Sequence, residues 1–140
     1  MNDDRDSDVP AAAGTAPARA TVLIVDDIAD HLRLYEMALS DRYEVLRASN
    51  GFDALKIAGA SRPDVVLLDV MMPGLDGWAV CERLKSQPAT AQTPVILMTA
   101  SAAPDVAARA KQVGAVAVLR KPYVVEHLSR AIETALSRYR

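Results

Sequence analysis

The feature that most constrains the fold is a set of short, continuous apolar runs that recur from residue 21 onward. The runs occupy residues 22–25, 65–68, 95–98 and 116–119, and the first three are rich in β-branched side chains. Runs of this length and composition are typical of strands that are covered on both faces. Residues 43–48 mix polar and apolar positions, as an edge strand with one wetter face would. The sequence therefore predicts five strands.

Segments with helical spacing separate these strands, and one more follows the last. They cover residues 30–41, 52–58, 78–85, 104–113 and 124–139. In the first, Leu32, Tyr35 and Leu39 fall on one stripe, and Asp76 is a good N-cap residue for the third. Strand and helix alternate five times, an order that requires a parallel sheet with right-handed crossovers and helices on both faces. The predicted fold class is α/β, doubly wound.

Polar residues follow the predicted strands at the points where the strands end. Asp26 and Asp27 follow the first strand, Asp69 the third and Thr99 the fourth, and Lys121 comes just after the fifth. In open parallel sheets, ligands bind outside the carboxyl ends of the strands. One Asp or Lys at a strand end is weak evidence of a site, because it often only returns the chain to solvent. Their coincidence at four strand ends predicts a functional site.

Three carboxylates close together repel one another unless a cation offsets them or one of them binds a proton. Oxygen ligands without His or Cys favour a hard cation, and Mg²⁺ commonly takes one or two carboxylates while it keeps several waters. We therefore expect Mg²⁺, with Asp27 and Asp69 as its ligands. Asp26 is expected to stand behind these ligands or to act through water, and the backbone carbonyl of Met71 is a further candidate oxygen.

Four motifs in this order and spacing, VLIVDD, VVLLDVMMPGLDG, PVILMTAS and LRKPY, resemble the response-regulator receiver domain of two-component signalling. The resemblance covers residues 21–140 almost without gaps. It implies a flavodoxin-like (βα)5 fold with strand order 2-1-3-4-5. It also implies Mg²⁺-dependent transfer of a phosphoryl group to Asp69 from a phosphohistidine partner or a small acyl phosphate. Such a protein is a signalling receiver that catalyses only its own phosphorylation and dephosphorylation.

The residues agree with this resemblance in their chemistry, with one departure. Lys121 and Mg²⁺ would neutralise the phosphoryl oxygens, Thr99 could donate a hydrogen bond to one of them, and the small Ala100 would leave the approach open. By resemblance, the peptide bond before Pro122 is cis. Receivers usually place Tyr or Phe three residues before the Lys, whereas this chain has Val118. A β-branched side chain cannot reproduce the usual Thr-to-aromatic relay.

Composition bounds the domain organisation and the partners. Residues 1–20 are rich in Asp and Pro and are predicted to be a disordered tail, whereas residues 21–140 form the receiver domain, expected to stand alone without an output domain. The net charge of −2 disfavours nucleic-acid binding. The absence of a long apolar run disfavours a membrane location, and the single Cys81 fits a reducing, cytoplasmic one. Expected partners are a histidine kinase or histidine phosphotransfer protein and a downstream protein target, with a homodimer also open.

Other classes fit the residues less well. Aspartyl-phosphate phosphohydrolases resemble Asp-x-Asp at the first strand, but here Asp26 and Asp27 are adjacent. A flavodoxin-like binding module would need a Ser/Thr/Gly-rich phosphate loop at that point. A receiver-shaped scaffold that takes no phosphate would usually have lost an acid or the Lys. His31 and His127 are expected to be surface residues far from the carboxylates, and Cys81 is expected to be a small buried hydrophobe.

Overall fold

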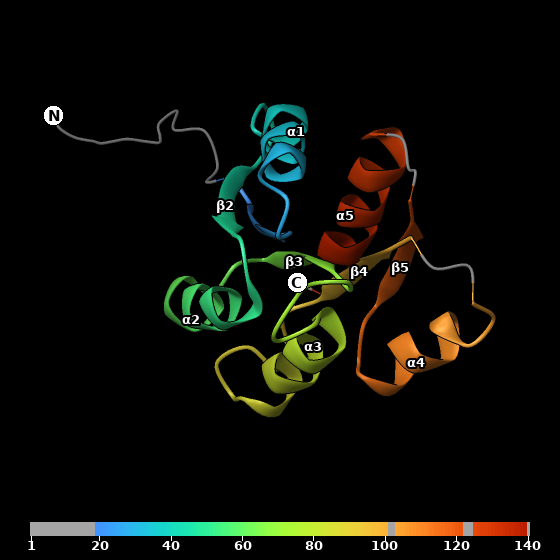
Figure 1. The fold of residues 1–140 in the computed structure, drawn as a ribbon. Coiled ribbons are helices and arrows are strands. Elements are labelled where there is room, and N and C mark those ends of the chain that lie inside the picture. The colour runs from blue at the N-terminus through green and yellow to red at the C-terminus, as the bar shows by residue number, and fades with distance from the viewer. Residues whose placement is uncertain (1–18, 101–102, 122–124, 140) are drawn as a thin grey trace, which may run out of the picture.

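The computed structural model of this chain describes residues 19–100, 103–121 and 125–139. Within these residues, five strands and five helices alternate along the chain, as predicted (Figure 1). The strands are β1 Thr21–Val25, β2 Glu44–Ala48, β3 Val65–Asp69, β4 Val95–Thr99 and β5 Ala117–Arg120. The helices are α1 Ala29–Leu39, α2 Gly51–Ser61, α3 Gly77–Ser86, α4 Val106–Gln112 and α5 Val125–Tyr139.

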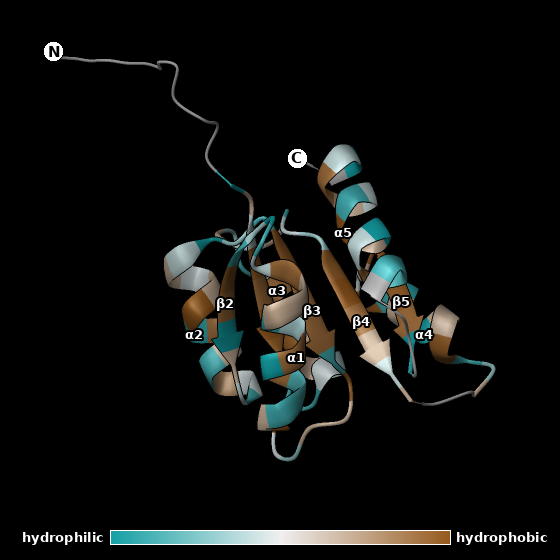
Figure 2. Cartoon of the chain, turned by 90° about the horizontal axis from the view of Figure 1, so that it is seen from above, coloured by the Kyte–Doolittle hydropathy of each residue, from teal (hydrophilic) through white to brown (hydrophobic). Residues whose placement is uncertain are grey.

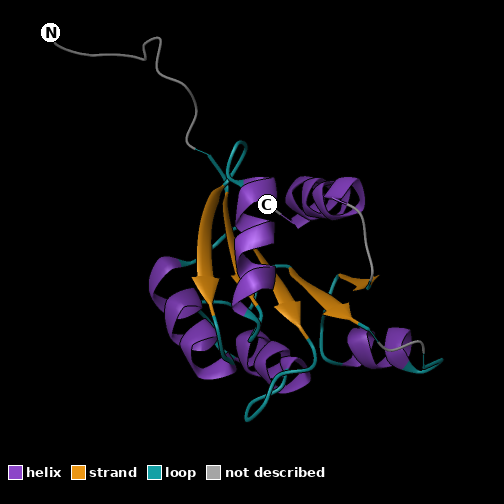
Figure 3. Ribbon diagram, turned by 45° about the horizontal axis from the view of Figure 1, so that its top comes forward, coloured by secondary structure: helices purple, strands orange, loops and turns teal. Residues whose placement is uncertain are grey.

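The strands form one sheet, drawn in orange in Figure 3. All neighbouring strands are parallel, and their order is β2-β1-β3-β4-β5. The fold class and strand order are therefore confirmed. The register pairs Val25 with Leu68, Asp69 with Met98, and Thr99 with Arg120. Neighbouring strands thus end at nearly the same level. This register brings the polar residues that follow them to one edge of the sheet.

Two helical layers cover the sheet: α1 and α5 lie on one face, and α2, α3 and α4 on the other (Figure 1). Side chains alternate between the faces along each strand. On β1, Val22 and Ile24 join the hydrophobic cluster under α1 and α5, whereas Leu23 and Val25 join the cluster on the opposite face. Figure 2 shows the result, with the strands mostly apolar and the helices mixed in hydropathy. The two clusters hold the strand ends, and hence the polar edge, in place.

The fifth strand departs from expectation. Residues 116–119 were predicted to be covered on both faces, but β5 lies at the edge of the sheet, where its apolar residues are half-buried and Arg120 is exposed. The prediction was wrong because an apolar run does not reveal whether a strand has one neighbour or two. The helix beside it is also shorter than the predicted 104–113, since α4 has only 7 residues.

The first described residues make contacts with the domain although they were assigned to the tail. The Arg19 guanidinium donates to the backbone carbonyls of Ser40 and Tyr43. The carbonyl of Ala20 accepts from the Glu44 N–H at 2.9 Å. Arg19 and Ala20 thus contact the domain and are not part of a disordered tail. No helix in the described part of the chain is both long and apolar enough to span a bilayer.

Candidate functional site

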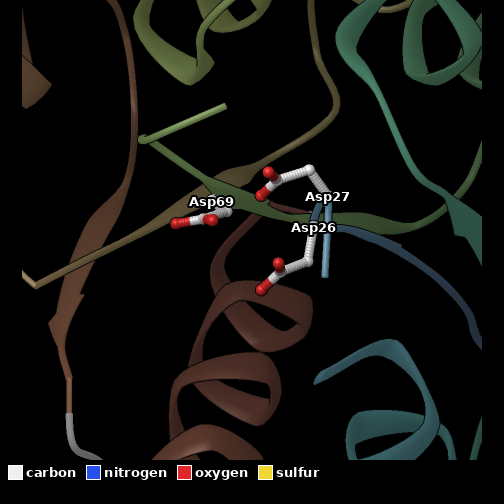
Figure 4. A group of neighbouring side chains, drawn as sticks. All are labelled: Asp26, Asp27 and Asp69. Atoms are coloured by element: carbon white, nitrogen blue, oxygen red, sulfur yellow. The ribbon is translucent and has the colours of Figure 1, made fainter. Parts of the chain in front are cut away.

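Three carboxylates gather at the carboxyl edge of the sheet (Figure 4). Asp26 and Asp27 directly follow β1, and Asp69 is the last residue of β3. One oxygen from each lies within 4.8 Å of an oxygen of the others. Asp26 is fully buried and Asp69 is 3% exposed, whereas Asp27 faces solvent. The structure therefore brings together the three acids that the sequence singled out.

Lys121 supplies the positive charge at this edge. Its Nζ lies 3.3 Å from Asp69 Oδ1 and 3.7 Å from Asp26 Oδ2. Its backbone N–H donates to the Thr99 carbonyl at 2.8 Å. The backbone bond fixes where the side chain starts, and the flexible stem lets the ammonium reach both acids.

The electrostatic balance of the site is negative. Burial raises the pKa of Asp69, and the neighbouring Asp26 raises it further, whereas Lys121 and a hydrogen bond from the Met71 backbone N–H act in the opposite direction. Burial lowers the pKa of Lys121, but the Asp69 and Asp26 carboxylates outweigh that effect and raise it overall. Lys121 is thus protonated at neutral pH. One ammonium faces three carboxylates, so a further cation would be favourable here.

The donor set suits a hard divalent cation. The cluster offers carboxylate oxygens, which Mg²⁺ prefers. The exposure of Asp27 leaves access for the waters that Mg²⁺ retains. The three acids therefore fit a hard divalent cation such as Mg²⁺.

The buried Asp26 has further partners that the sequence did not suggest. Its Oδ1 accepts the Ile28 N–H at 2.9 Å, and its Oδ2 lies 3.0 Å from His31 Nδ1. The prediction that His31 lies far from the carboxylates was wrong, because α1 begins only three residues after Asp26 and its first turn folds back over the strand end. A polar side chain in the first turn of the helix after this strand was the available signal. His127 is exposed on α5, as expected.

The loop after Asp69 is held close to β3. Gly77 begins α3, and its N–H donates to the Val70 carbonyl at 2.9 Å. A Cβ at this position would lie 2.4 Å from the Asp69 carbonyl oxygen, so only glycine fits. The predicted N-cap is confirmed, since the Asp76 side chain accepts from the Ala79 N–H at 3.0 Å. Within the loop, the Met71 side chain is 71% exposed.

Thr99 lies at the end of β4, buried, and Ala100 is exposed next to it. A cleft of about 220 Å³ opens beside Thr99 between the loop after β3, α3 and α4. Trp78 of α3 and Arg109 of α4 form part of its wall, and the guanidinium carbon lies 4.6 Å from the Trp78 ring centroid. This cation–π contact, which the sequence analysis did not single out, links α4 to α3.

Val118 lies half-buried on β5 and packs against the cluster on the α2, α3 and α4 face. A second cavity, of about 510 Å³, lies between α4 and β5 and includes Val118 in its wall. Among the described residues that line this cavity, Lys111 is the only charged one; the others are Ala and Val. This part of the surface is therefore largely apolar. The predicted cis bond at Pro122 lies outside the described residues.

Comparison with known proteins bears directly on this geometry. A family model described as the response regulator receiver domain matches residues 22–133. Protein PilH of Pseudomonas aeruginosa is 35% identical over 119 residues, which are 84% of this chain and 98% of PilH. The chain belongs to the response regulator receiver family. It is therefore a receiver domain of the kind found in two-component signalling.

Other receivers extend the comparison. The response regulator PleD of Caulobacter vibrioides is 50% identical over 82 residues, which are 58% of this chain but only 18% of PleD. The chain thus spans less than a fifth of PleD, one of the first curated relatives it matches. The structure of chemotaxis protein CheY4 of Vibrio cholerae superposes with a TM-score of 0.81 at 33% identity and covers 85% of this chain and all of that one.

Proposed function

We propose that this receiver is the phosphoacceptor of a two-component phosphorelay and that Asp69 takes the phosphoryl group. The observation that carries the proposal is the position of Asp69. Its buried carboxylate ends β3 within reach of Lys121 and beside two further acids. A structural strand-end Asp would not need a lysine that follows another strand and two more carboxylates around it.

In the proposed reaction, a carboxylate oxygen of Asp69 attacks the phosphorus of a phosphohistidine or a small acyl phosphate. A new O–P bond forms as the donor's N–P or O–P bond breaks, and the donor keeps the electron pair of the broken bond. The product is an acyl phosphate on Asp69. Because the acceptor of the phosphoryl group is a residue of this protein and not a separate substrate, we class the protein as a signalling receiver.

Several groups would stabilise the transferred phosphoryl group. Bound Mg²⁺ would supply positive charge to the phosphoryl oxygens, and Asp27, Asp69 and the Met71 carbonyl would hold it, with Asp26 behind them. The Lys121 ammonium is already 3.3 Å from Asp69 and needs only a small movement to contact a phosphoryl oxygen. Thr99 would donate its hydroxyl hydrogen from the adjacent strand end, and Ala100 would leave the approach open.

The donor is proposed to be a histidine kinase or a histidine phosphotransfer protein, and the receiver of the signal a downstream protein. The surface that changes would lie near Thr99, α4 and β5, because the Thr99 carbonyl accepts from the Lys121 N–H and Thr99 borders the cleft beside α4. Without an aromatic residue at position 118, movement of the 99–104 loop and α4 would carry the change. A second copy of this chain is a candidate partner for the same surface.

The decisive test replaces the proposed nucleophile. Asp69→Asn should abolish Mg²⁺-dependent phosphorylation by acetyl phosphate, measured by intact mass. The matched control is Asp76→Asn in the same loop, because Asn is also a good N-cap and should leave phosphorylation intact. Hydroxylamine-labile phosphate on Asp69→Asn at the wild-type level would refute the assignment.

The proposed metal ligand can be tested separately. Asp27→Ala removes an exposed carboxylate from the cluster, so it should abolish millimolar-range Mg²⁺ binding while leaving the fold intact. Isothermal calorimetry measures the binding, and Asp30→Ala, an exposed acid on the neighbouring first turn of α1, is the control. Unchanged Mg²⁺ affinity in Asp27→Ala would show that the ion is held elsewhere.

A further inference from the structure

We propose that His31 is a positioning residue for the phosphoacceptor site, one that keeps the buried Asp26 carboxylate hydrogen-bonded while Lys121 moves to the phosphoryl group on Asp69. This inference rests on the proposed function, because it concerns what the site must do when the phosphoryl group arrives.

The need for such a residue follows from the burial of Asp26. Its side chain is fully buried, so water cannot replace a lost partner. Among the described residues, three donor groups lie near it: the Ile28 N–H at 2.9 Å and His31 Nδ1 at 3.0 Å, both at hydrogen-bond distance, and Lys121 Nζ, which forms an ion pair at 3.7 Å. Removing donors from a buried carboxylate is strongly unfavourable. Asp26 would therefore resist the departure of Lys121 unless the other donors were sufficient.

The three donors differ in their freedom to move. The Ile28 N–H belongs to the backbone, whereas Lys121 carries its ammonium on a flexible stem and already shares it with Asp69 at 3.3 Å. Lys121 is thus the donor that can leave. His31 comes from α1, a different element from the strand that precedes Lys121, so it need not move with the lysine.

The His31 ring is held in its orientation. Its centroid lies 6.2 Å from that of Tyr35, one turn further along α1, and Tyr35 is buried in the core beneath α1 and α5. Because an ionised carboxylate only accepts hydrogen bonds, the Nδ1–H of His31 must be the donor to Asp26 Oδ2. The His31 side chain is 34% exposed, whereas the Asp26 side chain that it contacts is fully buried.

The consequence is a division of labour among the donors. With His31 present, Asp26 keeps two hydrogen bonds after Lys121 has moved to the phosphoryl group. Without it, the Ile28 N–H is the one hydrogen-bond donor from the described residues that Asp26 keeps, so Asp26 would retain Lys121. Phosphorylation should then be slower even though Asp27 and Asp69, the proposed metal ligands, are intact.

The test compares His31→Leu with His31→Asn, whose side-chain amide places a donor near the position of Nδ1. His127→Leu is the matched control, because His127 is the other histidine of the chain and lies exposed on α5. We expect the rate of phosphorylation by acetyl phosphate at saturating Mg²⁺ to fall about 10-fold in His31→Leu. His31→Asn should regain most of the rate, and His127→Leu should match the wild type.

A second reading uses the unphosphorylated protein. In His31→Leu the Lys121 ammonium should move closer to the Asp26 carboxylate. The 15Nζ resonance of Lys121 should therefore shift relative to wild type and to His127→Leu. An unmoved resonance, or a rate equal to that of His127→Leu, overturns the positioning role. If the wild type takes no phosphate but the Lys121 resonance moves as expected, the His31 contact is supported and the proposed function fails.

Discussion

The centre of the sheet, formed by β1 and β3, is packed more firmly than the β5 edge, the region formed by β5 and α4. β1 and β3 each have strands on both sides, and all five residues of β3 are buried. β5 has β4 as its one neighbour in the sheet, and its residues are half-buried or exposed. The acids lie at the ends of the central strands: Asp26 and Asp27 follow β1, and Asp69 ends β3. Lys121 follows β5 and belongs to the β5 edge.

This difference places the proposed phosphoacceptor site on rigid strands and the surface proposed to change shape on a less firmly packed edge. A carboxylate that must meet phosphorus in line benefits from a rigid strand end, because small displacements cost much of the rate. A surface that must change shape belongs where few buried contacts hold it. A phosphoryl group on Asp69 would link the centre of the sheet to the β5 edge. It would contact Lys121, which follows β5, and Thr99, which ends β4 beside the cleft that α4 lines.

The largest effect is expected for loss of the Lys121 ammonium, which links the β5 edge to the acids at the centre of the sheet. Lys121→Met leaves Asp26 and Asp69 facing each other without an ammonium, so it should lower the free energy of unfolding by about 2–3 kcal/mol. Removing one partner from a fully buried ion pair costs about 3–5 kcal/mol, and the 21% exposure of the Lys121 side chain reduces that penalty. Urea denaturation measures the change.

Lys111→Met is the control for this substitution, because Lys111 lies on α4, in the same β5 edge region, and is exposed. It should alter stability little. Equal destabilisation by the two substitutions would mean that the acids do not depend on Lys121.

A smaller effect of opposite sign is expected for Asp69→Asn. Burial and Asp26 raise the pKa of Asp69 above its ordinary value of 3.8, so the folded protein binds more protons than the unfolded chain just above that pH. Stability from this group is therefore lost as pH rises through the raised pKa. Without Mg²⁺, Asp69→Asn should melt at a higher temperature than wild type at pH 7.

The same substitution sharpens the electrostatic account through pH. The melting-temperature difference between Asp69→Asn and wild type should shrink as pH falls through the raised pKa of Asp69 and below 3.8, because the wild-type carboxyl is then protonated in both states. Scanning calorimetry across this range measures it. A difference independent of pH would show that charge on Asp69 does not destabilise the fold.

The smallest effect concerns the N-terminal segment. Deleting residues 1–18 should leave the melting temperature unchanged, whereas deleting residues 1–20 should cost about 1–2 kcal/mol, because it removes the Arg19 hydrogen bonds to Ser40 and Tyr43. Parallel thermal melts of the two truncations measure the difference. A clear loss in the shorter deletion would instead show that residues before Arg19 pack on the domain.

Much of this molecule could be predicted from its sequence because its signals are local. The apolar runs fixed the strands, and the polar residues after them marked Asp26, Asp27, Asp69, Thr99 and Lys121 as neighbours, since parallel strands end at one edge. The contact between His31 and Asp26 was missed because it depends on where α1 turns back over β1. The contact between Trp78 and Arg109 was missed because it depends on how α3 and α4 are set side by side.

Amide chemical shifts on addition of beryllofluoride and Mg²⁺ test most directly whether a phosphoryl group on Asp69 changes the β5 edge, the less firmly packed region formed by β5 and α4. The account predicts substantial shifts across residues 99–119 and at the Trp78 indole, because movement of α4 would change the Arg109 contact. Shifts confined to the immediate neighbours of Asp27, Asp69 and Lys121 would contradict it.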